Sequence, residues 1–290
     1  MTLPMFSDRI LTLLQPLEGT GTLEMAPDAL FCPETQTHYP FRNQIPSLCL
    51  ANHDWPPEPS QAVHAHYAGM EEFGDLVTRG HGDPFYHGLL KAIGYNKLIL
   101  DCGCGSGVLS NYLQLNNNHV LGIDISVSAL ALAIEYKMRN QLTRSGFIQM
   151  DLFHLAIRDN SCDVIIAHDV LHHTPNARLA CRHLVQKLRP GGIILVGVAN
   201  ALGKMPPWSR ATPLPPITRH TMDEVLDWFA ENNLEYLNCS PPILDTDGES
   251  VASLFAKTQP GTVFQRLITQ WSWRKGILFN MVGRKSLQKK

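Results

Sequence analysis

Short runs of apolar residues recur between residues 97 and 198, and each ends in a polar residue or a glycine. Runs of this length, bounded by turn residues, predict strands buried on both faces. Segments with apolar residues at helical spacing separate them. Strands that alternate with helices predict a mostly parallel sheet covered by helices on both sides. The predicted strands cover residues 98–101, 119–124, 147–151, 162–167 and 193–196, and the helices between them include residues 83–93, 108–115 and one that starts at Thr174.

The same pattern continues toward the C-terminus. Thr221 and Glu224 have the spacing of a capping box and predict a helix start. A sixth strand is expected at residues 234–238, one helix at residues 263–273, and an antiparallel seventh strand at residues 277–284. The expected fold class is therefore α/β, with a Rossmann-like, doubly wound, seven-stranded sheet that is mostly parallel and has an antiparallel last strand.

Residues 1–55 have a different pattern, with short strands and turns instead of strand–helix units. We expect a small β-rich N-terminal appendage there. Residues 56–82 contain several prolines and read as a linker or cap. This gives three parts: an N-terminal module (1–55), the linker (56–82) and the main domain (83–290).

Bulk composition narrows the function classes. The chain has 290 residues, 44% of them hydrophobic, and a net charge of −2 at pH 7, so no global basic field favours a nucleic-acid partner. No run of 18 apolar residues exists, which predicts no membrane span. Asp8 and Arg9 precede the one short apolar patch near the N-terminus, and no cleavage pattern follows it. Seven scattered cysteines fit reduced thiols and a cytoplasmic location.

The strongest local signal follows the first strand, where Asp101 precedes Gly103, Gly105 and Gly107. Glycines tolerate positive φ and allow backbone to approach a ligand closely. The next helix adds unpaired N–H groups at its start, and Asp101 can face a cationic group. The G-x-G-x-G spacing differs from the G-x-G-x-x-G of dinucleotide enzymes. At this point a methyl-donor site, a dinucleotide site and an ordinary turn remain open.

Asp124 ends the second strand, about 20 residues after the first glycine. A carboxylate at this place accepts hydrogen bonds from both hydroxyls of a ribose. The feature is shared by dinucleotide enzymes and methyltransferases, so it predicts a nucleoside ligand without separating the two.

Three further features follow in register: Asp151 after the third strand, Leu171-His172-His173 after the fourth, and Leu188-Arg189-Pro190-Gly191-Gly192 before the fifth. Together with the glycine turn they resemble the class I S-adenosylmethionine (SAM) methyltransferases of the ubiquinone/menaquinone type. The resemblance implies SAM as cofactor, S-adenosylhomocysteine as product and a small-molecule acceptor.

The resemblance also implies the cofactor contacts. The glycine turn would wrap the methionine and ribose, and Asp151 would bind the adenine amino group with apolar neighbours around the ring. The expected cofactor-binding residues are Asp101, Gly103, Cys104, Gly105, Gly107, Asp124, Ile125, Asp151, Leu152 and His168.

His172 and His173 are the candidates for a general base, because ligands bind beyond the carboxyl ends of the strands. A structural role for these histidines, in shaping the pocket or capping a helix, stays open. So do two other functions, an RNA or protein methyltransferase and a non-catalytic SAM-binding protein. The acceptor is expected to enter between these histidines, the proline-rich segment around Trp208 and the linker that carries His64, His66 and Tyr67.

The N-terminal segment resembles a small zinc-ribbon-like module (Trm112-like) found before some methyltransferase domains. Cys32-Pro33 matches the start of its Cys-Pro-x-Cys pair, but Thr35 replaces the second cysteine. His38, Cys49 and His53 lack paired ligand spacing, and a tetrahedral site needs four well-placed ligands. We therefore expect a degenerate module without metal.

Overall fold

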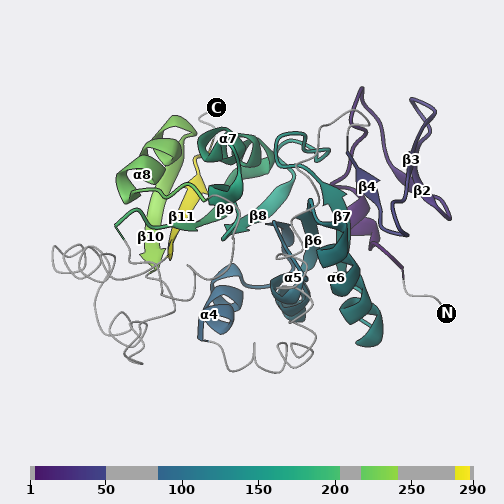
Figure 1. The fold of residues 1–290 in the computed structure, drawn as a ribbon, viewed down its shortest axis with the longest axis horizontal. Coiled ribbons are helices and arrows are strands. Elements are labelled where there is room, and N and C mark those ends of the chain that lie inside the picture. Colours follow the sequence, from purple (N-terminus) through teal and green to yellow (C-terminus); the bar gives the residue numbers. More distant parts are fainter. Residues whose placement is uncertain (1–3, 50–83, 203–216, 241–277, 288–290) are drawn as a thin grey trace.

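The computed structural model describes residues 4–49, 84–202, 217–240 and 278–287. Its centre is an eight-stranded sheet in the order β10-β11-β9-β8-β5-β6-β7-β4 (Figure 1). The strands β4 to β9 run parallel, and β11 is antiparallel to both of its neighbours. The predicted α/β fold with an antiparallel last strand is confirmed. The strands are β4 (Ser47–Leu48), β5 (Leu98–Cys102), β6 (His119–Asp124), β7 (Ser145–Met150), β8 (Cys162–His168), β9 (Leu188–Ala199), β10 (Leu234–Ser240) and β11 (Leu278–Lys285).

Two layers of helices cover the sheet, as Figure 1 shows, with α4, α5 and α6 on one face and α7 and α8 on the other. Alternation along β5 explains both layers. Ile99 packs in a cluster with α4 and α5, whereas Leu98 and Leu100 pack in the larger cluster that includes α7 and α8. Side chains of a strand alternate between its faces, so one apolar run serves both cores. The helices are α4 (Pro84–Ile93), α5 (Val108–Leu113), α6 (Val127–Arg139), α7 (Ala177–Lys187) and α8 (Met222–Glu231).

Capping side chains set the start of three helices, one of them as predicted and one not. Ser126 accepts a hydrogen bond from the Ala129 N–H, and Thr221 forms the full capping box with Glu224. The helix expected from Thr174 instead begins at Ala177, because the Asn176 side chain accepts the Leu179 N–H at 3.0 Å. Asparagine is among the best N-caps, so it overrides the Thr-Pro pair directly before it.

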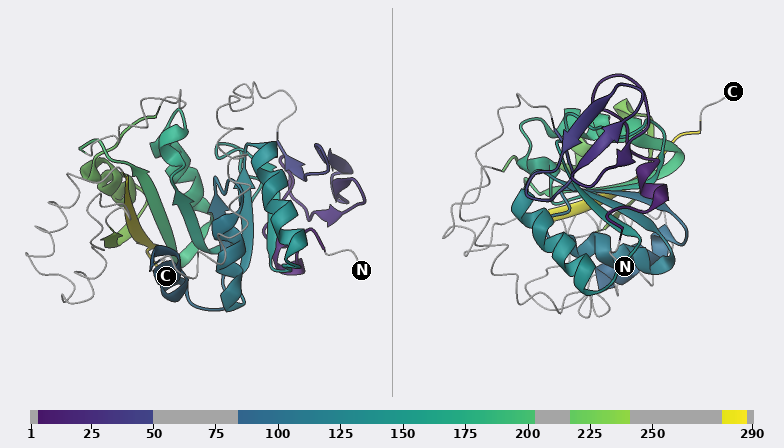
Figure 2. Two further views of the ribbon diagram at one scale, coloured as in Figure 1. Left: turned by 60° about the horizontal axis from the view of Figure 1, so that its bottom comes forward. Right: turned by 90° about the vertical axis from the view of Figure 1, so that its right-hand side faces the viewer.

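The N-terminal segment is more than an appendage. It contains α1 (Asp8–Leu11) and a separate antiparallel sheet of β1 (Glu24–Met25), β2 (Ala29–Cys32) and β3 (Thr37–Pro40). Beyond this sheet, β4 pairs in parallel with β7 and adds an eighth strand, which covers an edge that would otherwise expose unpaired backbone groups. Figure 2 shows the segment against that end of the sheet.

A buried lysine also fastens this segment. Lys137 of α6 is 1% exposed and donates hydrogen bonds to the carbonyl oxygens of Pro4, at 2.9 Å, and Met5, at 2.6 Å. Burial lowers the pKa of Lys137 to about 8. Phe6, Ile10, Leu13 and Leu14 belong to the same buried cluster as the central strands.

Cys32, the one match to the paired metal ligands of the resemblance, lies against a carboxylate. Glu34 accepts the Thr22 N–H at 3.1 Å, the Thr22 hydroxyl at 2.9 Å and the Cys32 thiol at 3.4 Å. Cys49 donates its thiol to the Gln149 carbonyl at 3.4 Å. Both thiols therefore have other partners, while His53 lies outside the described residues.

We expect Glu34→Gln to loosen the N-terminal sheet at neutral pH but not in acid. Hydrogen bonds from its own backbone and from Thr22 lower the pKa of Glu34 to about 2. A carboxylate whose pKa is lower in the folded state stabilises the fold at pH values above the pKa of the unfolded state. That stabilisation is lost as the pH falls through the pKa of the folded state. The difference in melting temperature between the native protein and the variant should therefore shrink between pH 4.5 and 2. A chelator should leave both melting temperatures unchanged, and a difference independent of pH would contradict this account.

Candidate active site

The predicted site residues converge at the carboxyl ends of β5, β6, β7 and β8. The order of the sheet reverses at β5, since β6 and β7 lie on one side and β8 and β9 on the other. In open α/β sheets the ligand crevice lies outside the carboxyl ends at such a switch point. The turn after β5 and the loop after β8 therefore face the same space.

The glycine turn after β5 has the backbone that its sequence predicts. Gly103, Gly105 and Gly107 have φ of 66°, 52° and 72°, in the left-handed region that side chains disfavour. A Cβ on Gly103 would lie 2.4 Å from Val170 Cγ2, and one on Gly107 would lie 2.6 Å from Ala133 Cβ. The turn thus packs so closely on the loop after β8 that no side chain fits at Gly103.

Asp124 is fixed at the end of β6 by two backbone groups. The Gly105 N–H donates to its Oδ2 and the Ser126 N–H to its Oδ1, each at 2.8 Å. Each carboxylate oxygen has a second lone pair, so the side chain keeps acceptor capacity for the two hydroxyls of a ribose. Burial raises the pKa of Asp124, against these hydrogen bonds, which lower it.

Asp101 is a buried carboxylate that accepts a hydrogen bond from a hydroxyl. It is 3% exposed, and the Ser110 hydroxyl donates to its Oδ2 at 2.6 Å. Burial raises the pKa of Asp101 to about 7, with a smaller contribution from the charge of Asp124. Such a group favours a cationic ligand, because an opposite charge restores its ionised form.

The other expected cofactor residues line the same edge. The N–H groups of Gly103 and Cys104 both donate to the Ile123 carbonyl, which ties the turn to β6. The Ile125 carbonyl accepts the side chain of Gln149 at 3.0 Å. Asp151 accepts the Phe153 N–H at 3.0 Å and contacts His154 Nδ1 at 2.9 Å, and its neighbour Leu152 is 8% exposed.

His168 ends β8 and is held by β11. Its Nδ1 lies 2.8 Å from the Oδ1 of Asn280, which is 1% exposed. Gly197 permits this contact, since a Cβ there would lie 2.3 Å from the same Oδ1. Sequence reasoning missed Asn280, because β11 joins the sheet from the far end of the chain.

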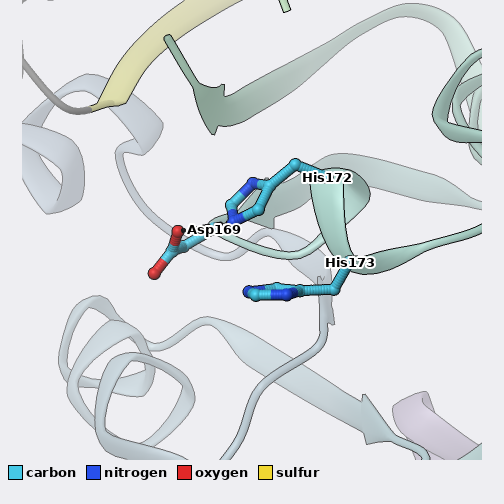
Figure 3. Close-up of side chains that lie close together, drawn as sticks. All are labelled: Asp169, His172 and His173. Carbon is cyan, nitrogen blue, oxygen red and sulfur yellow. Dashed lines mark ion pairs between the residues drawn. The ribbon is translucent and has the colours of Figure 1, made fainter. Parts of the chain in front are cut away.

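His172 is buried and has partners on both ring nitrogens. It is 3% exposed, its Nδ1 accepts the Ala199 N–H at 3.2 Å, and its Nε2 lies 3.2 Å from Asp169 Oδ1. Burial lowers the pKa of His172 to about 3, so the ring is neutral at pH 7. A neutral imidazole carries one proton. The Ala199 N–H on Nδ1 places that proton on Nε2, which faces Asp169 Oδ1 (Figure 3).

His173 shares the short helix η3 (Leu171–His173) but is exposed. Its ring centroid lies 4.2 Å from that of His172. Partial desolvation by its neighbours lowers the pKa of His173, while the charge of Asp169 raises it. The two predicted histidines therefore differ, because the His173 ring faces solvent and the His172 ring is part of the wall.

Asp169, His172 and His173 form the one group within the described residues whose atoms lie close enough to hold a metal, all within 4.8 Å of one another. A histidine that binds a metal through Nε2 carries its proton on Nδ1 and donates it to an acceptor. Here the partner of Nδ1 is itself a donor, the Ala199 N–H. The hydrogen bond to Nδ1 therefore disfavours a metal on Nε2 of His172.

Sequence reasoning also missed Asp169, although one signal was present. It directly follows β8, as Asp124 ends β6 and Asp151 follows β7. The rest of the expected acceptor side, His64, His66, Tyr67 and Trp208, lies outside the described residues. No helix among those that the structure describes is long and apolar enough to cross a membrane.

Comparison with known proteins finds a family model that matches the central part of the chain. The family model described as "Methyltransferase domain" matches residues 100–196. A ubiquinone biosynthesis O-methyltransferase of Cronobacter sakazakii is 27% identical over 110 residues, which are 38% of this chain and 45% of that protein. The chain thus matches less than half the length of that relative.

Solved structures agree on the fold. A Haloferax volcanii complex of the Trm112 methyltransferase activator with a putative methyltransferase has a TM-score of 0.54, with 18% identity over 78% of this chain and 96% of the other. Phosphoethanolamine N-methyltransferase 2 of Haemonchus contortus, solved with SAM, has a TM-score of 0.52, with 16% identity over 69% of this chain and 52% of the other. The glycine turn with Asp101 and Asp124 fits SAM, the ligand in that neighbour.

We expect the affinity for SAM to rise with pH up to about 7 and then to level off. Asp101, with its pKa of about 7, is protonated below this pH, and the cationic ligand must then displace that proton. Linkage predicts a dissociation constant roughly tenfold higher at pH 6 than at pH 8. Calorimetry at the two values measures it. Asp101→Asn should bind more weakly with a flat profile, and an equal pH dependence in that variant would contradict the assignment.

Proposed function

We propose that this chain contains a class I SAM-dependent methyltransferase domain. In this proposal the protein transfers the SAM methyl group to a small molecule that carries a hydroxyl. One observation carries the proposal. The turn that fits SAM packs directly on the loop that presents Asp169 and His173, through the contact of Gly103 with Val170. Methyl donor and proton acceptor thus belong to adjoining loops at one edge of the sheet.

The chemistry asks little of the protein beyond alignment. The sulfonium activates the methyl group, so the enzyme must hold nucleophile, carbon and sulfur in line and exclude water. A hydroxyl must also lose its proton. His173 is the proposed base, because its ring is exposed beside the site, whereas both nitrogens of His172 have partners. In this proposal His172 fixes the shape of the loop.

Charge and similarity support a small acceptor. The net charge of −2 gives no basic field for RNA. The Cronobacter relative is named an O-methyltransferase, which is compatible with a hydroxyl acceptor. We further propose that the acceptor enters beside the segments around Trp208 and His64–Tyr67, and that the protein acts in the cytoplasm as its free cysteines suggest.

A labelling experiment tests this function. The protein is incubated with methyl-labelled SAM and a cell extract separated by size, after ribonuclease and protease treatment of one half. We expect S-adenosylhomocysteine and label in the low-molecular-weight fraction, unaffected by either treatment. Asp124→Ala is the control. It removes the ribose contact, a charge-assisted pair worth roughly 1.5–3 kcal/mol, so turnover at limiting SAM should fall at least tenfold. Label only in RNA or protein, or SAM binding without turnover, would overturn the proposal.

Replacement of the two histidines one at a time distinguishes a general base from a structural residue. His173→Ala should lower the turnover number by roughly 10²–10⁴ and leave SAM affinity unchanged, as for loss of a general base. His172→Ala removes the buried acceptor of the Ala199 N–H and should instead lower the melting temperature. Turnover and calorimetry on both variants measure the effects. If both retain full turnover with the true acceptor, the site works by alignment alone.

A further inference from the structure

Asp169 has an unusual backbone at the end of β8. Its φ of 60° lies in the left-handed region, which aspartate tolerates better than most residues but still at a cost. Its N–H donates to the Gly197 carbonyl at 3.1 Å, so β9 fixes the turn. Non-glycine residues in such conformations concentrate at functional sites. The conformation directs a half-exposed carboxylate into the edge where the site lies.

The carboxylate has little freedom to turn away. His172 Nε2 lies 3.2 Å from its Oδ1, and His172 is itself fixed because its Nδ1 accepts the Ala199 N–H and its carbonyl accepts the Thr218 N–H at 2.9 Å. Figure 3 shows both rings on the same side of the Asp169 carboxylate, with the His172 ring above the His173 ring. Its oxygens lie within 4.8 Å of the ligand nitrogens of both histidines.

We propose that Asp169 is the positioning residue of the acceptor site, a role that rests on the proposed methyl transfer. Its carboxylate, oriented by His172, stabilises the protonated His173 ring. In the step, the acceptor oxygen forms a bond to the methyl carbon, and the carbon–sulfur bond breaks with its electron pair left on sulfur. The hydroxyl proton moves to a ring nitrogen of His173, which then returns it to solvent.

The charges around His173 are consistent with this division of roles. Among the described residues, the titratable groups near His173 are the neutral His172 of its own helix, His168 of β8, and Asp169, which follows β8. His220, before α8, acts on His172 and contacts Glu224 at 3.6 Å. Asp169 is the charge that acts on the His173 ring. As in a catalytic triad, a carboxylate beside an imidazole stabilises its protonated form. Here Asp169 is that carboxylate and His173 is the imidazole.

Asp169→Asn tests the role, because it removes the charge and keeps an oxygen for His172 Nε2. The pKa of His173, followed by NMR of its ring protons with S-adenosylhomocysteine bound, should fall by roughly 0.5–1 unit. The acidic limb of the turnover profile should move down by the same amount, and the plateau should fall roughly 10- to 100-fold, with SAM affinity unchanged. Asp169→Glu should restore part of the plateau.

Asp159→Asn is the matched control. It removes the same charge, but Asp159 pairs with Lys187 near the opposite end of β8, so the His173 titration should not move. An unchanged pKa or plateau in Asp169→Asn overturns the role of Asp169 alone. No turnover by the native protein with any small-molecule fraction overturns the proposed function, and this role with it. A zinc or manganese ion that binds the native protein but not Asp169→Asn, and on which turnover depends, would also overturn it.

Discussion

The close packing of the Gly103 backbone on the Val170 side chain, at the switch point of the sheet, determines the geometry of the site. The turn after β5 contacts Val170 at a position where even a Cβ would overlap. Since β5 and β8 are neighbouring parallel strands, this contact joins the cofactor turn to the loop that carries Asp169, His172 and His173. Displacement of one loop therefore moves the other. A methyl transfer depends on alignment over a few tenths of an ångström, so a rigid junction here matters more than any single ligand contact.

Much of this was predictable because the signals are local. Apolar runs predict the central strands. In β5 alternate residues pack into the two cores, so a strand at this place is consistent with helices on both faces of the sheet. Alternate glycines predict the turn, since the backbone there has positive φ at each of them. Asp124 was predictable from its place at the end of a strand, and both backbone N–H groups that hold it come from neighbouring turns.

What could not be predicted depends on pairing between distant segments. Nothing in Ser47–Leu48 shows that it adds to the edge of β7, a hundred residues further along the chain. Asn280 reaches His168 because β11 inserts between β9 and β10. The start of α7 was misplaced for a different reason, because Thr174 and Asn176 both offer a capping side chain. The short helix η3 fixes the loop before α7, and Asn176 then caps the helix.

The difference between His172 and His173 shows why adjacent identical residues need not share a role. A histidine is a base only while one ring nitrogen keeps an available lone pair and the charged form is tolerated. His172 meets neither condition, because the Ala199 N–H occupies Nδ1 and burial disfavours the charge. The backbone N–H of β9 thereby selects the tautomer, and the tautomer orients Asp169. A chain of contacts thus runs from β9 through His172 to the carboxylate beside His173, so the position of the base depends on the fold and not on the loop alone.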